Sequence, residues 1–307
     1  MVPLTQSAAQ EPPTMILRNL TLAPLALALA LPLTAASCSD DGGGSSGDAT
    51  TAVAVKFAGY VNGEDFACDK TFAHVGASDS TIAPLDFRFY VSDVKLVDAA
   101  GAEHAVTLDA DGKWQDGEVA LVDLEDKSGT CANGTTDVNT TIKGMVTAPK
   151  GTDFTGLRFT LGVPFDENHS DAATAASPLD LSGMFWSWQG GRKFLRIDSK
   201  LDGSANGYNV HIGSTGCELD ATTQEVSTCS APNRAVIDIA DYDMATDTIA
   251  VDYGAIVAGL DLTADGGGAP GCMSGKDDPE CGMVFDHLGI DLTTGSPKAG
   301  QTAFSAK

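Results

Sequence analysis

Two histidines on either side of a tryptophan pair are the residues of this chain whose types could bind a metal ion. His169 ends the run Phe-Asp-Glu-Asn-His, Trp186 and Trp188 follow in Met-Phe-Trp-Ser-Trp, and His211 comes later in Val-His-Ile-Gly-Ser. Imidazole suits copper, zinc, nickel and iron, and two imidazoles from separate segments can hold one ion if the fold brings them together. No H-x-H or C-x-x-C spacing accompanies them. The pattern alone also permits a loop role for His169 and an ordinary sheet role for His211.

The other residues that could take part in catalysis form no known catalytic motif. The sequence contains no G-x-S-x-G, no H-E-x-x-H and no glycine-rich phosphate loop. We therefore expect a protein that is not an enzyme. Trp186 and Trp188 share one face if their segment is extended, and aromatic core packing is the alternative role for either. Trp114 and the histidines His74, His104 and His287 are expected to lie outside any site.

The elements that must position these residues are predicted to be strands. Short alternating or apolar segments recur between clusters of Gly, Asp, Asn and Pro, which is typical of an antiparallel β-protein. They are Val53–Val61, Leu85–Val97, Val119–Leu124, Gly156–Val163, Lys193–Ser199, Tyr208–Gly213, Arg234–Ile239 and Thr248–Val251. The pattern predicts an all-β fold, an antiparallel β-sandwich with long loops that is linked by disulfides.

Local features refine this prediction. A shift in the apolar phase predicts a β-bulge near Ser92-Asp93. The turn Asp-Gly-Ser-Ala-Asn-Gly makes Lys193–Gly213 a β-hairpin, and this hairpin carries His211. Helix is scarce, and Tyr253–Leu260 is its best candidate.

The N-terminal region has the pattern of an export signal. Arg18 precedes an apolar run that is too short to span a bilayer and that ends in small residues before Cys38. We predict a signal peptide at residues 1–37, with Met15 as the possible true start. Ala-Ala-Ser-Cys resembles a bacterial lipobox, which predicts lipidation of Cys38, whereas ordinary cleavage near Ala36 would leave a free thiol.

Composition divides the remaining chain into a tether and a domain. Residues 38–51, with the lipidated cysteine at their start, are rich in Gly, Ser and Asp and predict a flexible tether. Residues 52–307 are expected to form a single domain. The net charge of −24 makes nucleic acid an improbable partner. Membrane association is expected through the lipid anchor only, in the periplasm or at the outer membrane.

A series of ordered blocks resembles a known family. The blocks include Phe87–Val94, Trp114-Gln115, Asp123–Asp126, Leu161–Phe165, Asn168-His169, Pro178-Leu179, Met184–Arg196, His211–Cys217 and Cys229–Arg234. They are similar to the methanobactin-operon copper proteins, also described as the four-cysteine half of the metallo-mystery pair. The resemblance spans about Val53 to Gly289. It implies a periplasmic copper protein in which a partner di-haem cytochrome c peroxidase-like protein oxidises one tryptophan to kynurenine.

The resemblance implies a site for one copper ion. His169 and His211 lie in the matching blocks and are the implied ligands, together with Trp186 or Trp188 after oxidation. Indole nitrogen carries a donor N–H and no lone pair for a metal, whereas the ring-opened product presents an amine that can coordinate. Arg192 stands where the family usually has tyrosine, a departure that we expect to affect the nearby surface and not the ligands.

The cysteines indicate disulfides. Cys38 apart, six remain, an even number that suits an oxidising compartment. Short loops favour Cys217 with Cys229 and Cys272 with Cys281, which leaves Cys68 for Cys131, although sequence alone does not decide among the possible pairings. Thiolate ligation of zinc or copper is the weaker alternative.

Two other functions compete with a copper-handling protein. A metal-free surface binding module would use the histidines and tryptophans for packing or for carbohydrate contact. A copper-dependent enzyme would use the same histidines and leave a coordination position open to substrate.

Overall fold

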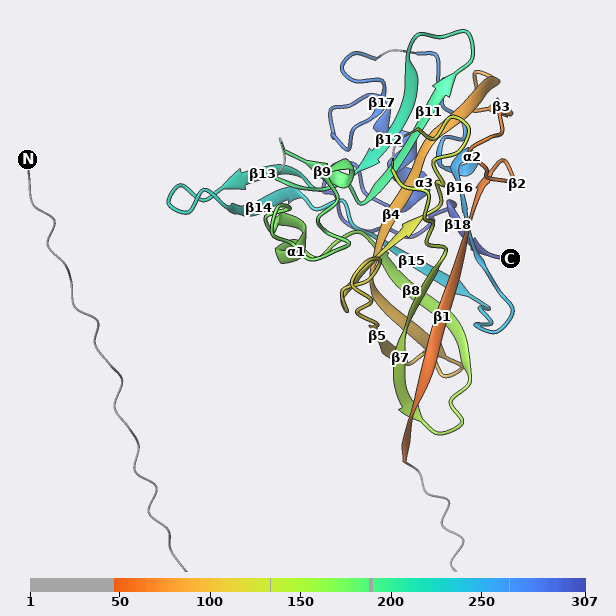
Figure 1. Ribbon diagram of the computed structural model, residues 1–307, viewed down its shortest axis with the longest axis vertical. Coiled ribbons are helices and arrows are strands. Elements are labelled where there is room, and N and C mark those ends of the chain that lie inside the picture. Colours follow the sequence, from red (N-terminus) through yellow and green to blue (C-terminus); the bar gives the residue numbers. More distant parts are fainter. Residues whose placement is uncertain (1–46, 133, 188–189, 265) are drawn as a thin grey trace, which may run out of the picture. The chain divides into compact units, whose positions relative to one another are not determined.

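Strands dominate the computed structural model, which describes residues 47–132, 134–187, 190–264 and 266–307 (Figure 1). The longer strands are β1 (Asp48–Val61), β4 (Ser80–Asp98), β5 (Glu103–Leu108), β6 (Val119–Asp123), β7 (Thr141–Pro149), β8 (Phe154–Leu161), β11 (Leu195–Leu201), β12 (Gly207–Ile212), β13 (Thr215–Leu219), β14 (Val226–Ala231) and β15 (Ala235–Ala240). The shorter strands are β2 (Glu64–Asp65), β3 (Phe72–Val75), β9 (Phe185–Trp186), β10 (Gly191–Arg192), β16 (Ile249–Asp252), β17 (Gly271–Cys272) and β18 (Phe304–Ala306). The helices are α1 (Phe165–His169), α2 (Tyr253–Ile256) and α3 (Cys281–Leu288), with a 3₁₀ turn at Ser182–Met184.

Most of these strands belong to one curled sheet, in which β4 has the most neighbours. Its main path runs β17-β12-β11-β4-β5-β7-β1-β16-β18, and β3, β6 and β8 also pair with β4. The register of β4 against β8 shifts between Ser92 and Lys95, and Asp93 has a φ of 51°. This irregularity confirms the predicted bulge. It lets the two halves of one long strand serve different parts of the sheet.

Aromatic side chains fill the concave core of the sheet. Phe57, Phe89, Phe159 and Phe304 are buried, and their rings meet edge to face at centroid distances of 5.6 to 5.9 Å. Such T-shaped contacts add to the stabilisation that burial of apolar area provides. The alternation that predicted one apolar face for β1 is confirmed, because Val53, Val55 and Phe57 are all buried.

The opposite face of the same strands carries a row of polar residues. Asp123 of β6, Arg88 of β4, Arg196 of β11 and His211 of β12 are cross-strand partners in consecutive pairs. Side chains of cross-strand partners project from the same face of a sheet. His211 is therefore one end of a polar row, and Gly183 lies beside Arg88 and Arg196 of that row.

The predicted all-β, disulfide-linked fold is confirmed. The structure contains the predicted disulfides, Cys68–Cys131, Cys217–Cys229 and Cys272–Cys281. The predicted hairpin is formed by β11 and β12. The predicted short helix within Tyr253–Leu260 is confirmed as α2, Tyr253–Ile256.

One boundary of the tether was wrong. The first strand begins at Asp48 and pairs with β7 from there onward, so the last residues of the segment 38–51 belong to the sheet. Composition suggested a flexible segment, but paired backbone groups and two β-branched threonines favour strand. The predicted signal peptide (1–37) and Cys38 lie outside the described residues. No helix in the described ranges is long and apolar enough to cross a membrane.

The buried carboxyl group of Asp123 makes folding sensitive to pH. Burial raises its pKa to about 7, against an ordinary value of about 3.9. The folded state thus holds this proton more tightly than the unfolded state, and the contribution to stability falls as pH rises from about 4 to about 7. Asp123→Asn keeps an oxygen acceptor for the N–H of Glu125 and removes the titration. We expect the variant to show a flatter dependence of the free energy of unfolding on pH in urea titrations.

The control for this experiment is Asp202→Asn, in an exposed turn, which should keep the wild-type slope. Part of the slope should persist in Asp123→Asn, because burial also raises the pKa of Glu125. Superimposable pH profiles for Asp123→Asn and the wild type would contradict the assignment.

Candidate metal centre

His211 lies on β12 and is held by a carboxylate of the neighbouring strand. Its Nε2 is 2.5 Å from Oδ1 of Asp198, which is 7% exposed. Burial opposes ionisation of Asp198, but the hydrogen bond with His211 and the charge of Arg196 outweigh it and lower the Asp198 pKa to about 2. An ionised carboxylate only accepts hydrogen bonds, so the proton of a neutral His211 resides on Nε2. Its Nδ1 then keeps a lone pair for a metal ion.

His169 presents the other type of ring nitrogen. Its Nδ1 lies 2.8 Å from the carbonyl oxygen of Gly190, and because a carbonyl can only accept, Nδ1 carries the proton. The lone pair is therefore on Nε2, to which Asn168 donates from Nδ2 at 3.0 Å. Burial lowers the pKa of His169, and the charge of Arg192 adds to this effect. The neutral imidazole needed for ligation is thus favoured.

Arg192 fixes the backbone that carries His169. It is 1% exposed, and its own N–H donates to Oδ1 of Asn168 at 2.7 Å. Its guanidinium donates hydrogen bonds to the carbonyl oxygens of Glu167, Asn168, Ser170 and Leu179. The short α1 cannot satisfy these carbonyls itself. The expectation that Arg192 affects only the nearby surface was wrong, because a long side chain at this position reaches into the interior and bonds the loop behind His169.

Trp186 is positioned by cations from β11 and the residues just before it. The carbonyl oxygen of Gly183 accepts hydrogen bonds of 3.0 Å from Lys193 Nζ and Arg196 Nη1. Burial lowers the pKa of Lys193 to about 8. The indole, 7% exposed, packs on the backbone of Gly213, where an added Cβ would lie 3.1 Å from Cζ3 of Trp186. Glycine is required for this close approach.

The described contacts link both histidines to Trp186. Its ring centroid is 6.0 Å from that of His211. Its partner in the β9–β10 pair is Gly191, whose added Cβ would lie 3.0 Å from Cε1 of His169. Both histidines thus lie beside the small β9–β10 pair, His211 next to Trp186 and His169 next to Gly191, although they are far apart in sequence. Trp188 lies outside the described residues.

A disulfide borders the site at His169. Cys229 Sγ lies 3.3 Å from His169 Nε2, and ligand atoms of His169, Cys217 and Cys229 are all within 4.8 Å of one another. Among the described residues, these three side chains form a group of His, Cys, Asp or Glu whose ligand atoms lie close enough together to hold a metal ion. In the disulfide form both sulfurs lack the negative charge of a thiolate ligand.

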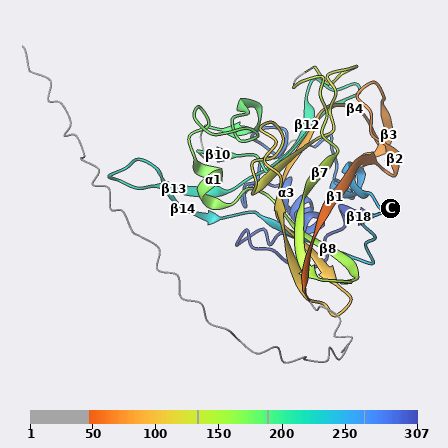
Figure 2. The ribbon, with the colours of Figure 1, turned by 60° about the horizontal axis from the view of Figure 1, so that its bottom comes forward.

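The surface beside His169 is hollowed. A cavity of about 590 Å³ lies between α1, β9 and the β13–β14 hairpin, and Phe165, His169, Phe185, Leu219 and Val226 are among its lining residues. Figures 1 and 2 show this hairpin extending from the sheet with α1 near its base. Phe165 and Leu219 are exposed apolar side chains in this region. His169 is therefore reachable from solvent.

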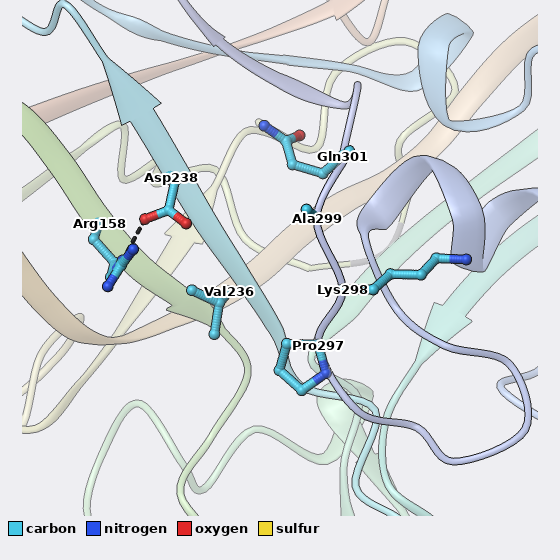
Figure 3. Close-up of a pocket in the computed structure, with 8 residues that line it drawn as sticks. Arg158, Val236, Asp238, Pro297, Lys298, Ala299 and Gln301 are labelled. Carbon is cyan, nitrogen blue, oxygen red and sulfur yellow. Dashed lines mark hydrogen bonds and ion pairs between the residues drawn. The ribbon is translucent and has the colours of Figure 1, made fainter.

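A second hollow, of about 460 Å³, lies away from these residues (Figure 3). Its cation Arg158 on β8 is already paired with Asp238 and Glu103. Lys298 pairs with Asp286 and points away from Arg158. With its cations neutralised by these partners, the hollow offers no evident charge for a ligand.

The donor set of the first site fits copper. Two neutral imidazoles each present one lone pair, and each is oriented through its other nitrogen by a carboxylate or a carbonyl. The histidines left out of the site have structural partners instead. His74 pairs with Asp79, His104 with Asp98, and His287 with the carbonyl of Ile256.

Residues that orient the ligands were missed in the sequence. Asp198 and Asn168 contact the two imidazoles, and Gly191 and Gly213 allow His169 and Trp186 to approach the backbone. The alternation of charged and apolar residues in β11 was a signal that Asp198 shares a face with Arg196. No pattern in the neighbouring sequence indicated that Asn168 contacts the segment of Gly191.

Comparison with known proteins identifies close relatives of this architecture. The family model described as MbnP matches residues 50–274. The solved structure of MbnP from Methylosinus trichosporium superposes with a TM-score of 0.74 at 32% identity, over 84% of this chain and 98% of the other. No curated protein matches the chain.

Removing the guanidinium of Arg192 should destabilise the fold. Arg192→Met keeps much of the side-chain length but leaves several buried carbonyl oxygens without donors, and we expect a loss of about 3 kcal/mol in the free energy of unfolding. Urea unfolding monitored by tryptophan fluorescence measures this loss. The matched control is Arg158→Met, whose partly exposed ion pairs should cost less than about 1 kcal/mol. Equal stability of the two variants would contradict the role of Arg192.

The protonation of His211 can be read directly. In ¹⁵N-detected NMR at mildly alkaline pH, we expect the wild-type His211 ring to carry its proton on Nε2. Asp198→Asn presents both a donor and an acceptor, so the tautomer should become mixed, while the His169 signals serve as an internal reference and stay unchanged. A wild-type ring protonated on Nδ1 would be incompatible with ligation through that nitrogen.

Proposed function

Since this chain belongs to the MbnP family, we propose that it is an exported copper-binding protein whose ligands are His169, His211 and an oxidised Trp186. One observation carries the proposal. The Trp186 ring centroid lies 6.0 Å from that of His211, and the strand partner of Trp186 is in close contact with His169. Copper accepts imidazole nitrogen readily.

Oxidation of Trp186 to kynurenine would supply the third ligand. Indole nitrogen has no lone pair for a metal. Two equivalents of peroxide, each reduced to water, deliver one oxygen atom each to C2 and C3 while the C2–C3 bond of the pyrrole ring is broken, and hydrolysis of the resulting N-formyl group releases C2 as formate. The product carries an aniline amine with a free lone pair in place of the indole N–H. A partner di-haem cytochrome c peroxidase-like protein is the proposed catalyst of this oxidation by peroxide.

Trp186 is a suitable candidate for the modified tryptophan because its surroundings are arranged for a ligand. Its backbone is held from Gly183 by Lys193 and Arg196, and its ring packs on Gly213 next to His211. A side chain that is fixed in this way loses little conformational entropy when it coordinates. These contacts also limit the freedom of the ring-opened product.

The chain's own residues provide binding and orientation. Asp198 keeps a lone pair on Nδ1 of His211, and Gly190 keeps one on Nε2 of His169. Bound copper would accept electron pairs from these nitrogen atoms. We propose storage, delivery or sensing of copper by a protein that is not itself an enzyme, in the periplasm or at the outer membrane, attached through lipidated Cys38.

The test is co-expression with the di-haem peroxidase of the same host. We expect the purified wild type to gain one oxygen and lose one carbon in intact-mass measurement and to bind about one copper ion per chain. Trp186→Phe should remain unmodified and bind copper at least about tenfold more weakly, and His169→Ala and His211→Ala should weaken binding by a similar factor.

Trp114→Phe is the matched control, because the Trp114 ring contacts Lys113 and packs against the apolar cluster around Tyr90 and Val119, and this variant should behave as the wild type. Trp188→Phe should keep the modification. Loss of the mass change in Trp188→Phe, with retention in Trp186→Phe, would transfer the role to Trp188. A metal-free wild type with unmodified tryptophans after co-expression would favour the plain binding module.

A further inference from the structure

The disulfide beside His169 differs from the other two in its access to solvent. Cys217 and Cys229 are both partly exposed. The remaining four cysteines, Cys68, Cys131, Cys272 and Cys281, are buried to 98% or more. Reductants must reach a sulfur atom to attack it, so accessibility selects among disulfides. The Cys217–Cys229 bond is therefore the one that a soluble reductant reaches first.

The local fold does not depend on this bond for its register. Cys217 and Cys229 are directly opposite in the antiparallel β13–β14 pair, which extends on both sides of them. The base of the hairpin is held by side-chain bonds, since Ser214 Oγ donates to the carbonyl of Pro232 and Asn233 Nδ2 donates to the carbonyl of Gly213. Opening the disulfide would thus leave both sulfur atoms near their present positions.

Nε2 of His169, which accepts a hydrogen bond from Asn168 Nδ2, also lies beside these sulfurs. The Nδ1–H of His169 is bonded to Gly190, and its Nε2 is the nitrogen that lies 3.3 Å from Cys229 Sγ. The nitrogen and both sulfurs fall within 4.8 Å of one another. Two thiolates and one imidazole form a soft ligand set that selects Cu(I) over harder cations.

We propose that reduction of Cys217–Cys229 creates a second, Cu(I)-selective binding mode in which both thiolates and Nε2 of His169 are the ligands. A dithiol reductant transfers two electrons and two protons to the disulfide, which becomes two thiols while the dithiol becomes a disulfide. Cu(I) then replaces the two thiol protons, which are released to solvent. The copper keeps its oxidation state throughout.

This binding mode shares only His169 with the proposed function. It requires neither His211 nor oxidation of Trp186, so either proposal can fail while the other stands. Where both hold, His169 can be a ligand in the oxidised protein and in the reduced protein, and the state of one surface disulfide decides which ligands accompany it.

The experiment uses the full-length chain made without the peroxidase, treated in its native state with dithiothreitol and freed of reductant by anaerobic gel filtration. Cu(I) is then titrated against bathocuproine disulfonate. We expect reduced wild type to bind Cu(I) at least about tenfold more tightly than the oxidised protein. Binding should produce near-ultraviolet thiolate-to-copper charge-transfer absorption.

Variants separate the ligands. Cys217→Ser/Cys229→Ser should show no gain on reduction, and His169→Ala should lose most of the gain. His74→Ala, at an exposed histidine that pairs with Asp79, is the matched control and should keep it. Mass mapping of alkylated wild type provides a measurement that needs no variant, because Cys217 and Cys229 should be labelled after mild reduction and protected by Cu(I). Equal Cu(I) affinity before and after reduction, or labelling of other disulfide cysteines first, would overturn the proposal.

Discussion

Buried cations that need hydrogen-bond acceptors determine where the candidate ligands lie. A guanidinium or ammonium group removed from water is tolerated only when its donors are satisfied. Arg192 finds its acceptors in backbone carbonyls around α1, and Lys193 and Arg196 share the carbonyl of Gly183. These acceptors lie in the connection between β8 and β9. This connection is held in place by the cations rather than by regular secondary structure of its own.

This arrangement explains how short elements can carry a precise site. The helix α1 has five residues and the β9–β10 pair only two in each strand, so neither is stable in isolation. Lys193 and Arg196 connect the residues before β9 to the large sheet, and Arg192 of β10 in turn holds α1. His169 and Trp186 are thus fixed by contacts with residues far away in the sequence. His211 is fixed directly by its position in β12 and by Asp198.

Sequence reasoning succeeded where the determinants are local. Alternation in β1 and β4, the phase shift at Ser92 and the short loop between Cys217 and Cys229 each depend on residues that are close in sequence. It failed for Arg192, because the acceptors of this residue are backbone carbonyls between Glu167 and Leu179. Every residue has a backbone carbonyl, so the residue types in this segment did not indicate the contact. The strands β5 and β7 and the helix α3 were also missed. In β7 two of the buried alternate positions are Gly144 and Ala148, which carry little apolar signal, and the state of the short β5 and α3 is decided by tertiary packing.

Electrostatics around His169 connect the disulfide to the choice of metal. Burial is the main cause of the lowered pKa of His169, and the positive charge of Arg192 lowers this pKa further, which means that Arg192 also disfavours an added positive charge at this ring. A metal cation bound to Nε2 meets the same repulsion, and it is weaker for a monovalent ion than for a divalent one. A neutral disulfide does nothing to offset the repulsion, whereas two thiolates bring negative charge within a few ångströms of the nitrogen. The redox state of Cys217 and Cys229 therefore alters both the number of ligands and the electrostatic cost of placing a cation beside Arg192.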